Sequence, residues 1–136
     1  MNKLEKNKLG FTMIELMAVI VIVGILAAIG MPAMWSQMAR QEGQEAINTM
    51  NMMRSAMESC GVANNGDLSN CTWDAINMAN PQDAAGAKFD YDWPARGSDG
   101  TYTMTATSKT GRGVITLWKD SSGMNCTATG SYRGLC

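Results

Sequence analysis

Few residues of this chain have side chains that could do catalytic chemistry. The 136 residues include no histidine, so neither a serine–histidine nor a cysteine–histidine relay can form. The cysteines contain no C-x-x-C pair, and without histidine this pattern disfavours a structural zinc site. The sequence also has no glycine-rich phosphate loop. We therefore predict a protein that is not an enzyme and that needs no cofactor.

Two patterns could bind a metal ion, and each has a simpler explanation. Asp90 and Asp92, with Asp99 or Asp120, offer the oxygen ligands that calcium prefers, but alternation with aromatic residues is typical of the solvated face of a strand. Several methionines of residues 50–57 could bind a soft metal, but their helical spacing is that of a packed core. We therefore predict no metal site.

One carboxylate stands in an unusual place. Residues 16–39 include no charged side chain, and residues 11–31 supply the roughly 20 apolar positions that a spanning helix needs. Glu15 lies near the start of this segment, where a charge persists only if a partner neutralises it. A cut after Gly10 would supply such a partner, because the new α-amino group of Phe11 would lie about one helical turn from Glu15, or near Glu15 of a neighbouring copy.

A basic leader that ends in Gly10, followed by Phe11-Thr12-x-x-Glu15 and a long apolar helix, resembles the signal of type IV prepilins and of the related pseudopilins of type II secretion. The resemblance implies that a prepilin peptidase cuts between Gly10 and Phe11 and methylates Phe11. It also implies that Glu15 and Thr12 are assembly residues, and that Glu15 pairs with the N-terminus of an adjacent subunit. The match is dense from Gly10 to about Ala39 and is lost beyond it.

Two helix-loosening positions of that family are also matched. Gly24 and Pro32 lie where the family places its glycine and proline. Pro32 lacks an N–H group and its ring crowds the preceding turn, which predicts a bend or local loosening over residues 28–32.

Other readings of the N-terminus remain open. An ordinary secretory signal peptide could be cut near residues 27–30, but Glu15 would interrupt its apolar core. A single-pass anchor that never polymerises is the second alternative.

The three lysines of the leader, against one glutamate, predict a cytoplasmic leader and an exported C-terminal part. The mature chain would carry a net charge of −3, and we assign no nucleic-acid partner.

The expected organisation has three parts. Residues 1–10 are a leader that is removed, residues 11–35 are the half of a long helix that lies in the membrane or the filament core, and residues 36–136 form a globular head. The head divides into an amphipathic helix half (36–60), a connecting loop (61–87), and an antiparallel sheet with a C-terminal loop (88–136).

The four cysteines all lie in the part predicted to be exported, where disulfides form. They allow three connectivities, and the sequence alone does not choose among them. Pairing Cys60 with Cys71 and Cys126 with Cys136 closes two short loops, so we favour it. The resemblance to pilins adds weight to the second pair, because many pilins close a C-terminal loop with a disulfide.

The head should combine one helix with a small sheet. A helical stripe is predicted to pack on the head, and Gly61 is a candidate C-cap after it; the stripe comprises Ala46, Met50, Met53, Met57 and Cys60. Residues 72–78 could form a short helix. Alternating patterns predict strands over 88–93, 101–107 and 114–118, and a fourth strand near Met124, with turns at 94–100, 110–113 and 121–123.

The fold class predicted from these elements is α+β, with a three- or four-stranded antiparallel meander on the amphipathic half of the helix, as the pilin resemblance also implies. The function predicted is a structural subunit of a type IV pilus-like filament, with assembly machinery of the inner membrane as a further partner. The precursor would lie in the inner membrane and the filament at the cell surface. The alternatives are a minor pilin, a secretion pseudopilin, or a membrane-anchored binding module.

Overall fold

The computed structural model describes residues 10–136, with the side chains of residues 93–95 excepted. The predicted leader, up to residue 9, and the side chain of Trp93 in the first predicted strand therefore lie outside the described part of the chain. The chain divides after Trp35 into two compact units. Helix α1, Met13–Ala63, contributes its first half to one unit and its second half to the other.

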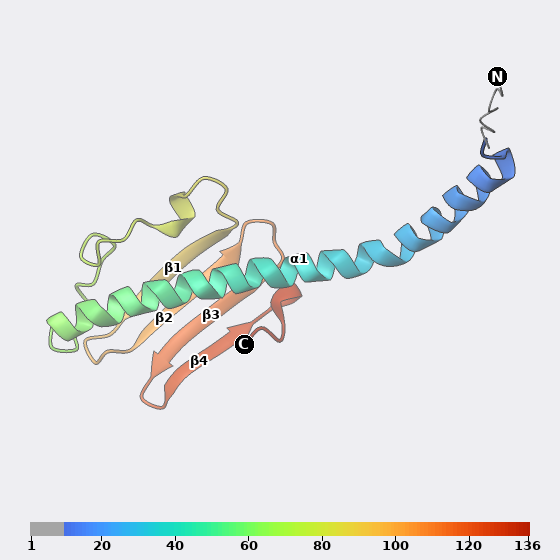
Figure 1. Cartoon of the computed structure of the whole chain (residues 1–136). Coiled ribbons are helices and arrows are strands. Elements are labelled where there is room, and N and C mark those ends of the chain that lie inside the picture. The colour runs from blue at the N-terminus through green and yellow to red at the C-terminus, as the bar shows by residue number, and fades with distance from the viewer. Residues whose placement is uncertain (1–9) are drawn as a thin grey trace, which may run out of the picture. The chain divides into compact units, whose positions relative to one another are not determined.

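The second unit is an α+β head, as predicted. Its sheet has four antiparallel strands in the order β1-β2-β3-β4, and Figure 1 shows the second half of α1 lying along one face of this sheet. The strands are β1 (Phe89–Arg96), β2 (Tyr102–Ser108), β3 (Val114–Asp120) and β4 (Gly123–Ala128). Two short 3₁₀ helices, η1 (Pro81–Asp83) and η2 (Gly130–Tyr132), were not predicted.

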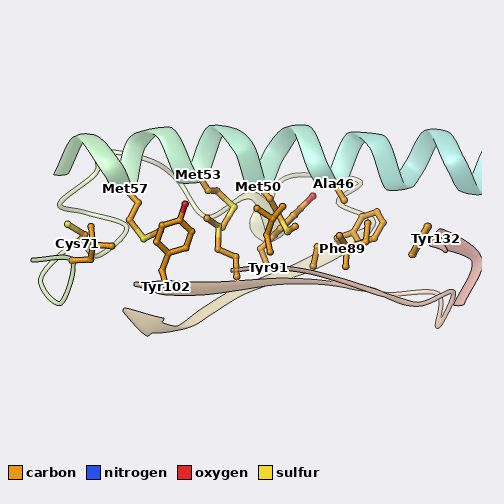
Figure 2. Packing of buried hydrophobic residues seen from close by; sticks show 14 of the residues in the cluster. Ala46, Met50, Met53, Met57, Cys71, Phe89, Tyr91, Tyr102 and Tyr132 are labelled. Atoms are coloured by element: carbon orange, nitrogen blue, oxygen red, sulfur yellow. The ribbon is translucent and has the colours of Figure 1, made fainter. Parts of the chain in front are cut away.

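The core of the head lies between α1 and the sheet. The helix buries one residue about every three or four positions, including Ala46, Met50, Met53 and Met57 of the predicted stripe; Cys60 is only partly buried. Figure 2 shows the methionines meeting Tyr91 and Tyr102 of the sheet. These methionine side chains are fully buried within an apolar cluster, so they fill the core.

The register of the sheet explains which side chains face the helix. Tyr91 is opposite Ala106, which is opposite Ile115, and all three are buried. Because side chains alternate along a strand, the intervening threonines and aspartates face solvent. Phe89 is also buried, so Phe89 and Tyr91, which alternate with the aspartates of β1, both face the core.

Three predicted boundaries were wrong. Gly61 does not end the helix: α1 continues to Ala63, and Asn65 and Gly66 then reverse the chain with positive φ angles of 56° and 94°. The amide of Gly66 donates to the Gly61 carbonyl at 2.7 Å, which caps the helix one turn later. Gly61 is buried against Leu68 instead: a Cβ at this position would lie 2.6 Å from Leu68 Cδ2.

The turn predicted over residues 94–100 starts too early. Strand β1 runs through Pro94 to Arg96, with a shift of register between Asp92 and Ala95. Pro94 is tolerated because β1 is an edge strand, where a missing N–H donor costs no ladder bond. The helix predicted over 72–78 is reduced to hydrogen-bonded turns: the Ile76 amide donates to the Thr72 carbonyl at 3.1 Å.

Two disulfides and one ionic cluster fasten the head. Cys60 is bonded to Cys71 and Cys126 to Cys136, which confirms the favoured pairing. Glu42 of α1, 14% exposed, pairs with Arg112 at 2.6 Å and with Lys88 at 3.6 Å. This cluster joins the helix to the β2–β3 turn and to the start of β1.

Candidate functional site

The candidate site begins at the N-terminus of α1. Gly10, Phe11 and Thr12 precede the helix in a solvent-exposed segment without regular secondary structure, and Phe11 is 89% exposed. The peptide bond between Gly10 and Phe11 is therefore accessible to solvent. The Leu16 amide donates to the Thr12 carbonyl at 3.2 Å, which places Thr12 at the N-cap.

Thr12 and Glu15 form a reciprocal pair of hydrogen bonds. The Thr12 amide donates to Glu15 Oε2 at 2.8 Å, and the Glu15 amide donates to Thr12 Oγ1 at 3.3 Å. This is a capping box, in which two amides without a helical partner are satisfied by side chains. A threonine followed three residues later by glutamate is the sequence signature of a capping box, so Thr12-x-x-Glu15 could have predicted these bonds, although we did not predict them.

The capping box changes how the charge of Glu15 can be understood. The Thr12 amide donates to Oε2 of Glu15, so Oε1 can accept a further donor. The carboxylate also lies at the positive end of the helix dipole, which favours a negative charge there. Glu15 thus has stabilising contacts within its own chain even before any neighbour is considered.

The apolar part of α1 follows directly. Among the described residues, α1 is a helix long and apolar enough to cross a membrane, and its most apolar stretch has no buried residue. The side chains from Leu16 to Ile29 that are large and apolar are all more than half exposed. Gly24 and Pro32 lie within α1, which continues through both, and a Cβ added at Gly24 would meet no atom within 4 Å. Their predicted loosening of the helix stays a prediction.

The aspartates of the calcium hypothesis do not meet. Asp90 pairs with Lys109 at 3.4 Å, whereas Asp99 accepts bonds from the amide and hydroxyl of Thr101. Asp120 caps the next turn through Ser122, and these hydrogen bonds lower the pKa of both Asp99 and Asp120. Within residues 10–136, no three histidine, cysteine, aspartate or glutamate side chains are grouped so as to hold a metal ion.

Taken together, the fold and the site define a class of protein: an exposed apolar helix with a capped, acidic start, joined to a small disulfide-bonded α+β head. A family model described as the prokaryotic N-terminal methylation motif matches residues 6–31. This match covers both sides of the Gly10–Phe11 bond and includes Glu15.

Curated relatives of this chain include type IV major pilins. The type IV major fimbrial protein FimA of Dichelobacter nodosus is 36% identical over 90 residues, which are 65% of this chain and 55% of FimA. The type IV major pilin protein PilE1 of Neisseria gonorrhoeae is 37% identical over 125 residues, 92% of this chain and 49% of PilE1. The fimbrial protein EcpC of Eikenella corrodens is 53% identical over 45 residues, 33% of this chain and 29% of EcpC.

The motif and these relatives confirm the resemblance to type IV pilins that the N-terminal residues indicated. The chain spans about half the length of FimA and PilE1, and less of EcpC. No solved structure is a significant match.

Proposed function

We propose that the chain is the structural subunit of a type IV pilus-like surface filament. The observation that carries this proposal is the N-terminus of α1, where a capped glutamate begins an exposed apolar helix directly after an accessible Gly10–Phe11 bond. An exposed apolar helix of this length is stable only in a membrane or against other helices. A filament of packed helices satisfies the second requirement.

The proposed pathway starts with a precursor in the inner membrane, with residues 1–10 on the cytoplasmic side. A prepilin peptidase cuts between Gly10 and Phe11 and methylates Phe11. The apolar half of α1, residues 11–35, then passes from the membrane into the filament core with the help of inner-membrane assembly machinery, and the head, residues 36–136, faces outward. Gly24 and Pro32 would let the helix adapt to both surroundings.

Glu15 would set the register between copies. The capping box holds its carboxylate at the start of the helix, and its second oxygen would accept the N-terminal amine of an adjacent subunit. In an apolar surrounding such an ion pair is strong, and removing one partner leaves an uncompensated charge. A copy in the wrong axial position would therefore be disfavoured.

The first test is the intact mass and N-terminal residue of the chain recovered from cell envelopes, with and without reduction. The proposal expects a chain that starts at Phe11, is heavier by one methyl group, and gains the mass of two pairs of hydrogens on reduction. A chain that still starts at Met1, with monomers in mild detergent, would favour the membrane-anchored module. A cut near residues 27–30 would indicate an ordinary secreted domain.

A further inference from the structure

The outward face of the second half of α1 has an unusual composition. At 100° per residue, the positions turned away from the sheet form one stripe over residues 37–62, about 38 Å long. Every residue of this stripe is solvent-exposed, yet none carries a charge. We call it the uncharged stripe; its members are Gln37, Gln41, Gln44, Asn48, Asn51, Met52, Ser55, Ser59 and Val62. Met52 and Val62 are 59% and 83% exposed.

Two glutamates of this helix half contact other parts of the head, whereas Arg40 and Glu45 are exposed at the edges of the stripe. Glu42 is bound to Arg112 and Lys88, and Glu58 accepts the hydroxyl of Tyr102 at 3.2 Å. A helix face that stays in water usually carries charged residues, whereas the core of a protein interface is depleted of them. The composition of the uncharged stripe is therefore that of a surface covered by a partner.

From these observations we infer that the uncharged stripe is the docking surface for the same helix half of a second copy of this chain, parallel and shifted along the axis. This inference deepens the proposed function and rests on it for the parallel orientation, because all copies start from the same side of the membrane. It extends helix packing beyond the apolar half, into the head.

The chemistry of the stripe favours a second copy over another partner. Each glutamine or asparagine amide carries both donors and an acceptor, so identical stripes can satisfy one another, which a stripe of one charge cannot do. Ser55 and Ser59, four residues apart, allow two helices to approach closely. An open hollow of about 570 Å³ on this face, lined by Gln41, Gln44, Asn48 and Met52 among others, could receive side chains.

The edges of the stripe also carry opposite charges near residues 40–45. Arg40 and Glu45 both line the hollow, and five helical positions place them about 140° apart around the axis, on opposite edges. When parallel copies follow one another around a filament, one edge of each helix faces the other edge of the next. Arg40 of one copy would then face the edge that carries Glu45 in its neighbour, while two copies of the same edge would not meet.

The test introduces a charge in the middle of the stripe of the full-length chain. Asn48→Glu should insert normally and be cut at Gly10, but should reduce filament yield at least tenfold, because a buried carboxylate would lack a partner. Asn48→Gln keeps the amide and should assemble like the wild type. Thr127→Glu, on an exposed position of β4, is the matched control for an added charge and should also assemble normally.

A photo-crosslinking amino acid at position 48 gives a second readout that does not depend on filaments. We expect dimers of this chain whose crosslinked peptide lies within residues 37–62. Normal filaments from Asn48→Glu, or capture at position 48 of a different protein instead of a second copy, would overturn the inference and leave the proposed function standing. If the wild type forms no filaments, the proposed function fails, and self-crosslinking at position 48 still decides whether the stripe binds a second copy.

Discussion

Glu15 has two separable roles at the scale of one residue. Its carboxylate caps its own helix through Thr12, and it is proposed to pair with the amine of a neighbouring subunit. Glutamine at this position keeps an oxygen that can accept the Thr12 amide but removes the charge. Comparing glutamine and alanine substitutions therefore distinguishes the two roles.

We expect Glu15→Ala and Glu15→Gln both to insert into the membrane and both to lose filaments at least tenfold, because neither can form the ion pair. Filament yield by electron microscopy and by shearing from cells is the measurement. Thr12→Ala, which removes the hydroxyl of the capping box and keeps the charge, is the control and should have the milder effect. Wild-type filament yield from Glu15→Gln would show that the charge is not needed.

Tyr102 provides a residue-scale prediction about pH. Burial, followed by the negative charge of Glu58 that accepts its hydroxyl, raises the pKa of Tyr102 above its usual value of about 10. A group whose pKa is raised on folding contributes stability that is complete below its unfolded pKa and is lost as the pH rises through the folded value. The stability of the head should therefore fall above about pH 10.

The measurement is the melting temperature of the full chain in detergent between pH 7 and pH 11.5, for the wild type and for Tyr102→Phe. At pH 7 the variant should be less stable by about 1 kcal/mol, the usual worth of one hydrogen bond. It should lose less stability than the wild type on going to alkaline pH. Parallel decreases in the two proteins would refute the assigned role of Tyr102.

At the scale of elements, α1 and the C-terminal segment approach each other at Gly43. A Cβ at this position would collide with Leu135 and lie 2.9 Å from Cδ1 of Tyr132, which is fully buried. The close approach therefore requires glycine, although glycine is a poor helix former. Leu135 lies next to Cys136, so the second disulfide holds this contact in place.

Gly43→Ala should lower the stability of the head by about 1 to 3 kcal/mol, the usual cost of overpacking, despite the better helix propensity of alanine. Thermal unfolding of the full chain in detergent measures it. Gly30→Ala is the matched control, because its Cβ meets no atom within 4 Å and it should be neutral or slightly stabilising. Equal melting temperatures for the two variants would mean that the chain relaxes around Gly43 without cost.

Periodic features of the elements were predictable, and features set by distant parts were not. The methionine stripe and the alternation from Phe89 to Tyr91 follow from local spacing, which reports which face is buried. The extension of α1 past Gly61 depends on Leu68 packing against that glycine, and the place of Pro94 inside β1 depends on its being an edge strand. Neither can be read from a local pattern.

The candidate site shows the same division. The cleavage motif and Glu15 lie within a few residues of each other, so the sequence predicted them, and the capping box follows the same local rule even though it was overlooked. The ion pair of Glu42 with Arg112 joins residues 70 positions apart. Its existence depends on the register of the sheet against α1, which no local spacing specifies.

At the scale of the whole molecule, the described features that stabilise the head all lie after Trp35. Every residue of the buried cluster lies between Ala39 and Tyr132, and no residue from 11 to 35 belongs to it. Both disulfides and the Glu42 cluster are also in the second unit. The head should therefore not need the apolar half of α1 in order to fold.

We expect residues 36–136, expressed in an oxidising compartment, to fold as a soluble protein with both disulfides formed. Its far-ultraviolet circular dichroism should show a helix and a sheet, and its melting temperature should match that of the head in the full chain. The apolar half would then serve only anchoring and assembly, since none of its described residues belongs to the buried cluster. An unfolded or aggregated fragment would show instead that the first half of α1 supports the head, and the separation of anchoring from folding would have to be abandoned.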